Sequence, residues 1–212
     1  MGITSSVADA YRRQVVPRVV DKACGSRAMQ AGRDRAAAGL SGVVLELGFG
    51  SGLNLASYPP EVTLVQAVEP SEVGRRLSEK RVAEGRVPVV FAGLRGEAID
   101  LPDDSCDSAL CTFTLCTIPG VEQALAELRR VLRPGGRFHF LEHGLAPDAG
   151  VQRWQHRLEP VQMALADGCH LTRDPALLVS DAGLRIESVE REYMKGPKPW
   201  VYMTFGQAVN PG

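Results

Sequence analysis

The chain has 212 residues, of which 44% are hydrophobic and 23% are charged, and its formal net charge is −1. These proportions are typical of a single globular domain, and the near-neutral charge argues against a nucleic-acid or anionic-membrane partner. No run reaches the roughly 18 apolar residues of a membrane span, and the N-terminus carries no signal-peptide pattern. We therefore expect a soluble cytoplasmic protein without a membrane span, present as a monomer or a homodimer.

Five cysteines are spread along the chain, at positions 24, 106, 111, 116 and 169. Their number is odd and no CxxC pair occurs, so the pattern predicts neither a disulfide framework nor a metal site. A reducing cytoplasm fits this usage.

The first 40 residues are predicted to be helical over 8–38, with Pro17 marking a break or a helix start. Strands and helices then alternate. Apolar runs predict five strands, and helical spacing predicts helices between them; the strands are expected at 43–47, 63–68, 87–93, 107–112 and 137–143, and the helices at 71–83 and 121–133. The turn Arg133-Pro134-Gly135-Gly136 separates the second helix from the fifth strand.

The last third of the chain predicts two more helices and a strand pair. Residues 151–166 show one apolar face with a kink expected at Pro160, and a short helix begins at Asp174-Pro175 and ends at Gly183. Residues 184–194 and 200–209 look like a final antiparallel pair. Alternating strands and helices indicate a parallel α/β sheet covered on both faces. Ligands bind such sheets where strands end, here at 48–54, 69–71, 96–98, 112–116 and 142–144.

The stretch 43-VVLELGFGSGLN-54 places glycines 48, 50 and 52 directly after the first strand. A dinucleotide loop reads GxGxxG, so the third glycine comes one position early, and the GxxxxGK[ST] of a P-loop is absent. The carboxylate of Glu46 beside the loop is unfavourable for phosphate and suits a ligand with ammonium and sulfonium groups. Glu69 after the second strand can accept both hydroxyls of a ribose. Glu97 and the N–H of Ala98 can read an adenine edge.

These motifs, together with the LRPGG turn, resemble a class I S-adenosylmethionine-dependent methyltransferase over roughly residues 40–145. The resemblance implies a seven-stranded, mostly parallel Rossmann-like sheet with helices on both faces and its last strand antiparallel. It implies S-adenosylmethionine as cofactor and S-adenosylhomocysteine as product. Members usually carry Asp where Glu97 stands here. The implied cofactor-binding residues are Glu46, Gly48, Gly50, Gly52, Asn54, Glu69, Pro70, Glu97, Ala98, Thr112 and Leu115.

A narrower resemblance rests on CTFTLCTI (111–118), FLEHG (140–144), WQHRLEP (154–160) and DGCHLTRD (167–174). These segments look like the methyltransferase-like alkyl-thiol methyltransferases and their bacterial relatives. The animal members carry an N-terminal hydrophobic membrane anchor that this sequence lacks, so the resemblance does not lead us to expect membrane association here. The resemblance implies Thr114, Cys116, Trp154, Cys169 and His170 on the substrate side.

Several candidate residues also have a structural interpretation. His143 follows the fifth strand and is the candidate general base, although it can equally be a hydrogen-bonded structural histidine. His139 alternates with phenylalanines on a strand and is predicted to be structural. Cys111 and Cys116 are more often small buried hydrophobes than reactive thiols. Trp154 has the spacing of a core anchor.

We expect one methyltransferase domain over 1–212, with a helical cap at 1–40, a cofactor core at 41–145, and acceptor-side helices and strands at 146–212. The predicted reaction is S-methylation of a small-molecule thiol, because a thiolate forms near neutral pH without a dedicated base. C- or N-methylation of a quinone precursor, a phospholipid or another small molecule is the alternative within enzymes. A non-catalytic S-adenosylmethionine-binding protein and, further off, an NAD-dependent oxidoreductase are the alternatives of other classes.

Overall fold

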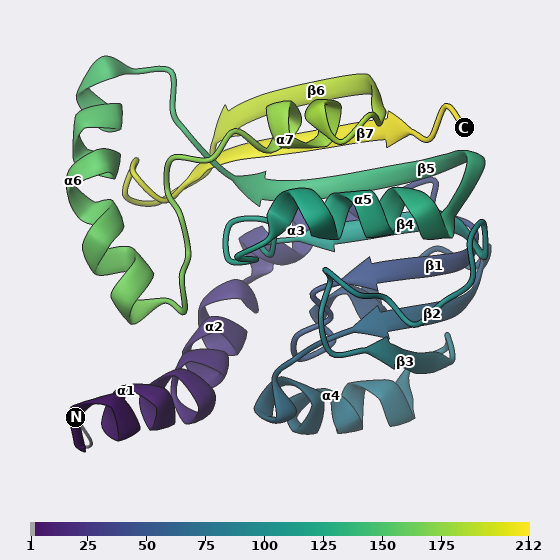
Figure 1. Ribbon diagram of the computed structural model, residues 1–212, viewed down its shortest axis with the longest axis horizontal. Helices are drawn as coiled ribbons and strands as arrows, with labels where there is room; N and C mark the ends of the chain where they lie inside the picture. The colour runs from purple at the N-terminus through teal and green to yellow at the C-terminus, as the bar shows by residue number, and fades with distance from the viewer. Residues whose placement is uncertain (1–2) are drawn as a thin grey trace.

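The computed structural model describes residues 3–212, which form one seven-stranded sheet in the order β3-β2-β1-β4-β5-β7-β6 (Figure 1). The first five strands run parallel, and β7 is antiparallel to both of its neighbours. This arrangement confirms the predicted fold class. The strands are β1 (Gly42–Leu47), β2 (Val62–Val68), β3 (Val89–Gly93), β4 (Cys106–Thr112), β5 (Leu132–His143), β6 (Arg185–Tyr193) and β7 (Tyr202–Val209).

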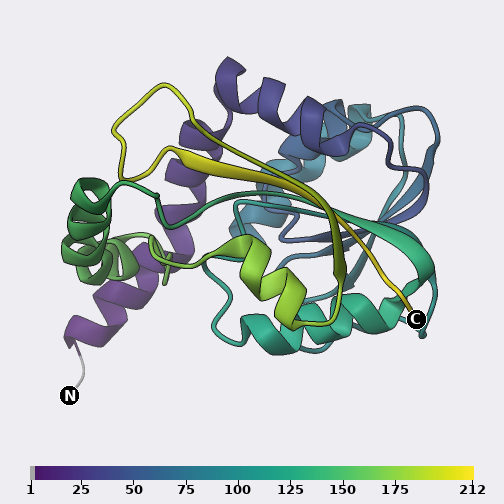
Figure 2. The same cartoon turned by 90° about the horizontal axis from the view of Figure 1, so that it is seen from above.

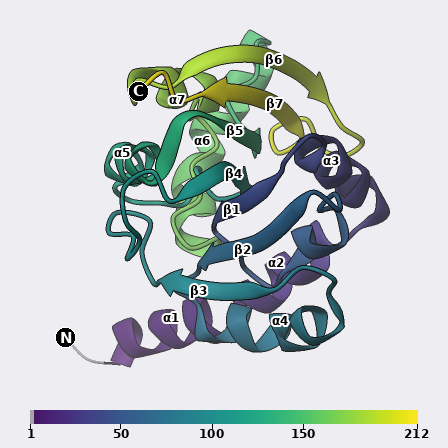
Figure 3. The same ribbon diagram turned by 90° about the vertical axis from the view of Figure 1, so that its right-hand side faces the viewer.

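Helices cover both faces of the sheet, as Figures 2 and 3 show. One face carries α3 (Arg27–Ala37) and α4 (Glu72–Glu84), and the other carries α5 (Val121–Val131) and α7 (Pro175–Asp181). The remaining helices, α1 (Ile3–Gln14), α2 (Val16–Cys24) and α6 (Ala149–Leu165), lie beyond the carboxyl ends of the parallel strands. Within residues 3–212, no helix combines the length and apolarity needed to cross a bilayer.

Two apolar clusters hold these layers together. On the α5 side, Leu125 and Leu128 pack with Phe138 and Phe140 of β5, all at most 1% exposed. On the α3 side, Ala37 packs in a second cluster with residues such as Leu110 and Leu141. Because successive side chains of a strand face opposite sides, β5 feeds both clusters, and its near-continuous apolar run matches a sheet buried on two faces.

The N-terminal helical region is divided more finely than the sequence predicts. Pro17 occupies the first turn of α2, where its missing N–H breaks no helical hydrogen bond. A second break follows at Gly25, and the Ser26 side chain then caps α3 by accepting from the N–H of Met29. The predicted helix over 8–38 is therefore three helices set at angles to one another (Figure 1).

The fifth strand also begins earlier than expected. The turn after α5 is part of β5, which starts at Leu132 and pairs there with Cys106. Gly135 has φ of 76° and its N–H donates to the carbonyl of Asn210, so the turn is tied to the end of β7. The LRPGG turn therefore ends the helix as predicted. It also forms the first part of β5, where the segment that follows β7 accepts a hydrogen bond from it.

Candidate active site

A cleft of about 460 Å³ opens at the carboxyl ends of the parallel strands, where sheets of this kind bind ligands. Its walls come from the segments that follow β1, β2, β3 and β4, from the side of α2, and from Ala166 and Asp167 after α6. Seven of the predicted cofactor residues line it: Gly48, Gly50, Asn54, Glu69, Pro70, Glu97 and Thr112. Thr114, predicted on the substrate side, lines it as well, whereas the predicted cofactor residue Gly52 does not.

The three glycines of the loop after β1 all adopt positive φ, at 79°, 56° and 76° for Gly48, Gly50 and Gly52. A Cβ built on Gly48 would lie 2.0 Å from Oγ1 of Thr114, so this glycine is required for close contact between the β1 and β4 loops. A Cβ on Gly50 would meet nothing within 4 Å, because this backbone faces the cleft. The loop therefore presents bare backbone to a ligand.

Glu69 lies at the end of β2 and is only 6% exposed. Its Oε2 accepts from the N–H of Gly50 at 2.6 Å, and its Oε1 accepts from the N–H of Ser71 at 2.7 Å. Burial raises the pKa of this carboxyl, and the two backbone hydrogen bonds partly oppose that rise. Glu69 thus ties the glycine loop to the start of α4 while its remaining lone pairs face the cleft.

Glu46 lies one layer below the cleft, which corrects the prediction that it lines the ligand. Its side chain is fully buried; Oε1 accepts from Asn54 at 2.7 Å and Oε2 accepts from the hydroxyl of Tyr58 at 2.5 Å. Asn54 in turn accepts from Nη1 of Arg33 at 2.8 Å, and the same nitrogen donates to Thr112 at 2.6 Å. Glu46 therefore positions Asn54, which does line the cleft.

The Glu46 carboxyl also makes stability depend on pH. Burial raises its pKa from an ordinary 4.5 to about 7, against the hydrogen bonds from Tyr58 and Asn54. A raised folded-state pKa means that the folded protein binds the proton more tightly, so the free energy of unfolding falls as the pH rises from about 4.5 to about 7.

Glu46→Gln is expected to remove this loss. Relative to the unmodified protein, the variant should gain up to about 3 kcal/mol in the free energy of unfolding between pH 5 and pH 8. Urea unfolding at several pH values measures the difference, with the exposed Glu61→Gln as a matched control. A Glu46→Gln curve parallel to that of the unmodified protein would show that Glu46 titrates normally.

The segment after β3 differs in detail from the prediction. Glu97 lines the cleft and its Oε1 accepts from the N–H of Gly120 at 3.3 Å. Ala98 does not line it, and its N–H donates to the carbonyl of Arg95 at 3.3 Å. The backbone donor that we expected to read an adenine edge is therefore already used within the loop.

The loop after β4 is fixed by a carboxylate from β5. Oε1 of the fully buried Glu142 accepts from the N–H groups of Thr114 and Leu115, at 2.8 and 3.1 Å. Phe113, just before them, has φ of 55°, a rare conformation for a non-glycine residue that is found preferentially at functional sites. Thr114 faces the cleft, whereas the predicted cofactor residue Leu115 is 1% exposed and packs into the α5-side core.

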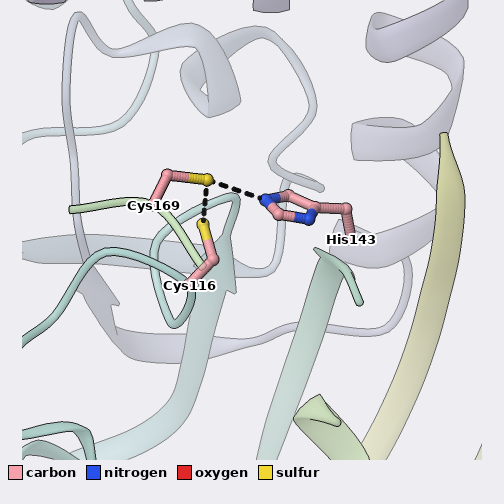
Figure 4. A group of neighbouring side chains, drawn as sticks. All are labelled: Cys116, His143 and Cys169. Atoms are coloured by element: carbon pink, nitrogen blue, oxygen red, sulfur yellow. Dashed lines mark hydrogen bonds between the residues drawn. The ribbon is translucent and has the colours of Figure 1, made fainter. Parts of the chain in front are cut away.

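Three predicted residues meet just behind this loop. Figure 4 shows Cys116, His143 and Cys169 pointing toward one another from the β4 loop, the end of β5 and the segment after α6. Sγ of Cys169 lies 3.6 Å from Sγ of Cys116 and 3.2 Å from Nε2 of His143. The hydrogen bonds with Cys116 and His143 lower the pKa of Cys169 against the effect of burial. For His143, the interaction with Cys169 outweighs burial and raises the pKa.

The other acceptor-side predictions are not brought to the cleft. Trp154 on α6 is 57% exposed and lies beside Lys198 and Pro199, so it is neither a core anchor nor part of the cleft wall. His170 points to Glu159, with 3.0 Å between Nδ1 and Oε1. The apolar spacing of residues 151–166 predicts one packed face, but Trp154, Val161 and Leu165 on that face are exposed in the described part of the chain.

The sequence predicts a helical cap over 1–40, but it does not indicate which side chains of these helices reach the cleft. Arg33 of α3 is 5% exposed and lines the cleft, with its guanidinium 5.1 Å from the centre of the Phe113 ring. Asp21 of α2 also lines it, and its carboxylate accepts from Ser51 of the glycine loop at 2.6 Å. Arg33 lies among alanines and other charged residues, a pattern typical of a solvent-exposed helix face. The residue spacing therefore does not indicate that Arg33 reaches the cleft.

Comparison with known proteins agrees with this geometry. Residues 45–140 match the family model described as a methyltransferase domain. The [4+2]-cyclase SpnF superposes with a TM-score of 0.73 at 17% identity, covering 97% of this chain and 95% of that one. This likeness concerns the fold alone. Sheet order, glycine loop and family match are those of the class I S-adenosylmethionine-dependent methyltransferases, and S-adenosylmethionine, the predicted cofactor, is the cofactor of that class.

Curated relatives narrow the family further. Thiol S-methyltransferase TMT1B of Rattus norvegicus is 35% identical over 162 residues, covering 74% of this chain and 65% of that protein. TMT1B of Homo sapiens is 35% identical over 169 residues, covering 77% and 68%. Phosphatidylethanolamine N-methyltransferase of Cereibacter sphaeroides is 30% identical over 170 residues, covering 77% and 79%. The chain belongs to the methyltransferase family that includes the TMT1B proteins, and it spans about two thirds of their length.

Proposed function

We propose that this protein is an S-adenosylmethionine-dependent methyltransferase that methylates the sulfur of a small thiol. One observation carries the proposal: the segment 167–174, one of the four that resemble thiol methyltransferases, begins in the wall of the cleft. Asp167 lines the cleft, and two residues later Cys169 contacts Cys116 of the β4 loop.

The residues present fit the cofactor. When bound, S-adenosylmethionine supplies an electrophilic methyl group on a positively charged sulfur. Gly50 offers backbone without a side chain, and Glu69 offers a carboxylate already oriented by two backbone N–H groups. Asn54, held by Glu46 and Arg33, adds a polar side chain at the floor of the cleft. These groups bind and orient, which is most of what an in-line displacement needs from a protein.

The acceptor side favours a nucleophile that ionises easily. Among the lining residues of the segments 112–119 and 166–167, Asp167 has the only ionisable side chain. An alcohol, whose pKa lies far above 7, needs a stronger base than a carboxylate to lose its proton, whereas a thiol ionises within reach of neutral pH. His143, the candidate base, lies behind this wall and contacts Cys169 instead.

N-methylation of a phospholipid headgroup is the second candidate. It is supported by the 30% identity to phosphatidylethanolamine N-methyltransferase of Cereibacter sphaeroides, of which this chain covers 79%. An amine acceptor must also be neutral to attack, so the same weakly basic wall would limit its rate near pH 7.

Purified protein incubated with methyl-labelled S-adenosylmethionine tests the proposal. We expect labelled thioether from at least one member of a panel of small alkyl and aryl thiols, and no labelled product from the matched alcohols. Product formation from phosphatidylethanolamine vesicles alone would favour the second candidate. Tight cofactor binding without S-adenosylhomocysteine release on any acceptor would contradict both and indicate a binding protein.

A further inference from the structure

We propose that Cys116, His143 and Cys169 form a binding site for a thiophilic divalent cation of the Zn²⁺ type, and that its open coordination position holds the acceptor thiol as a thiolate. The cation site stands on geometry alone, whereas the role of the open position rests on the thiol methylation proposed above.

The distances between the donor atoms match a tetrahedral site. With Zn–S bonds of about 2.3 Å and Zn–N bonds of about 2.0–2.1 Å, tetrahedral angles place two sulfurs about 3.8 Å apart, and a sulfur and a nitrogen about 3.6 Å apart. The observed separations are 3.6 Å between the sulfurs and 3.2 Å between Nε2 of His143 and Sγ of Cys169. All three donor atoms lie within 4.8 Å of one another, so an ion needs only small side-chain shifts.

The chemistry of the donors selects the class of ion. Two thiolates and one imidazole are soft and borderline ligands, which favour Zn²⁺ over Mg²⁺ or Ca²⁺. Cys116 and Cys169 are 4% and 7% exposed, which limits access by water. The ligands lie 27 and 26 residues apart along the chain, which is why their spacing matched no known metal motif.

The backbone holds the ligands in place without the ion. Glu142 fixes the loop just before Cys116, and the carbonyl of Cys116 accepts from the N–H of His170 at 2.9 Å. The N–H of Cys169 donates to the carbonyl of Ala166 at 3.1 Å. A backbone hydrogen bond therefore joins the segment that carries Cys116 to the segment that carries Cys169. His143 extends from the end of β5 toward both thiols (Figure 4).

A set of three protein ligands is typical of a catalytic metal site. Structural zinc sites use four protein ligands, whereas catalytic sites use three and leave a position for water or substrate. Two residues next to the cluster line the cleft. Thr117 directly follows Cys116, and the carbonyl of Ala166 accepts a hydrogen bond from the N–H of Cys169. An acceptor thiol reaching the ion from the cleft would be close to the methyl donor.

The step balances without any redox partner. The acceptor's S–H bond breaks on binding the cation, and its proton passes to water. The new S–CH₃ bond forms as the cofactor's S–CH₃ bond breaks, with the electron pair remaining on the cofactor's sulfur. Neither the cation nor the cysteines change oxidation state.

Metal binding can be measured without activity. Protein stripped with a chelator should take up one Zn²⁺ per chain, and Co²⁺ in its place should give the intense thiolate-to-metal absorption of a sulfur-ligated site. Cys116→Ser, Cys169→Ser and His143→Gln should each lose this uptake. Cys106→Ser is the matched control, since Cys106 is 1% exposed on the far end of β4 and does not contact the cluster.

The outcomes separate the two proposals. Zn²⁺ uptake that is lost in the three variants but kept in the control supports the site, even if no thiol is methylated. A saturable shift of the Co²⁺ spectrum on adding a small alkyl thiol supports the open position; absence of that shift overturns it. Protein that binds no Zn²⁺ or Co²⁺ in the reduced form, or whose Cys116 and Cys169 are recovered only as a disulfide, overturns the site whether or not the thiol panel is methylated.

Discussion

Replacing Gly50 with alanine is expected to weaken cofactor binding strongly while leaving the protein folded. The added Cβ meets no protein atom within 4 Å and so enters the cleft that the loop lines. A methyl group there displaces the ligand from the backbone, and we expect S-adenosylmethionine affinity to fall at least about a hundredfold, which is about 2.8 kcal/mol. The left-handed conformation at φ of 56° adds only about 1–2 kcal/mol of destabilisation.

Gly48→Ala is the matched contrast two residues earlier. Its Cβ would lie 2.0 Å from Oγ1 and 2.6 Å from Cβ of Thr114, so the two loops must separate. Strain and overpacking together predict a loss of about 2–5 kcal/mol in the free energy of unfolding. Thermal unfolding and calorimetric titration of both variants check the pair. The assignment of Gly50 to the ligand-facing backbone fails if Gly50→Ala binds normally, or if it unfolds as easily as Gly48→Ala.

Glu69→Gln is expected to weaken cofactor binding by about 10- to 100-fold. One amide oxygen cannot replace two carboxylate oxygens, so the N–H of either Gly50 or Ser71 loses its acceptor, and a ribose loses a charged partner. Because the loop is fixed before the ligand arrives, the effect should appear mainly in the dissociation constant and only weakly in the rate at saturating cofactor.

Glu72→Gln supplies the control for that experiment. Glu72 is exposed in the first turn of α4, three residues from Glu69, and carries the same charge. Equilibrium binding of S-adenosylmethionine should be unchanged in this variant. Equal weakening in both variants would mean that net charge near the cleft, and no direct contact, determines the affinity.

The sheet and its ligand edge could be predicted from sequence because they depend on local signals. Apolar runs ending at Leu47, Val68 and Thr112 placed three strand ends within one residue of the structure. Glycines at positions that require positive φ marked the loop, since no other residue adopts that conformation as cheaply. The LRPGG turn ended its helix as predicted, but its pairing with the chain end depends on Asn210, far away in sequence.

The features that the sequence does not predict correctly depend on contacts between distant segments. Arg33 serves the cleft because α3 packs beside the β1 loop, and helical spacing cannot indicate which polar side chain turns inward. Trp154 shows the converse: its apolar spacing predicted burial, yet it is 57% exposed. The sequence marks Cys116, His143 and Cys169 only as separate candidates, and only the tertiary fold brings them together.

The position of Glu142 has a consequence for comparing related sequences. Glu142 does not line the cleft, yet its carboxylate accepts from the N–H groups of the cleft-lining Thr114 and of Leu115, the residue before Cys116. A relative that kept every lining residue but lost this carboxylate would leave the N–H groups of Thr114 and Leu115 without this acceptor and loosen the loop. Surveys that infer activity only from the residues touching a ligand would therefore count inactive proteins as active, and position 142 is the one to check first.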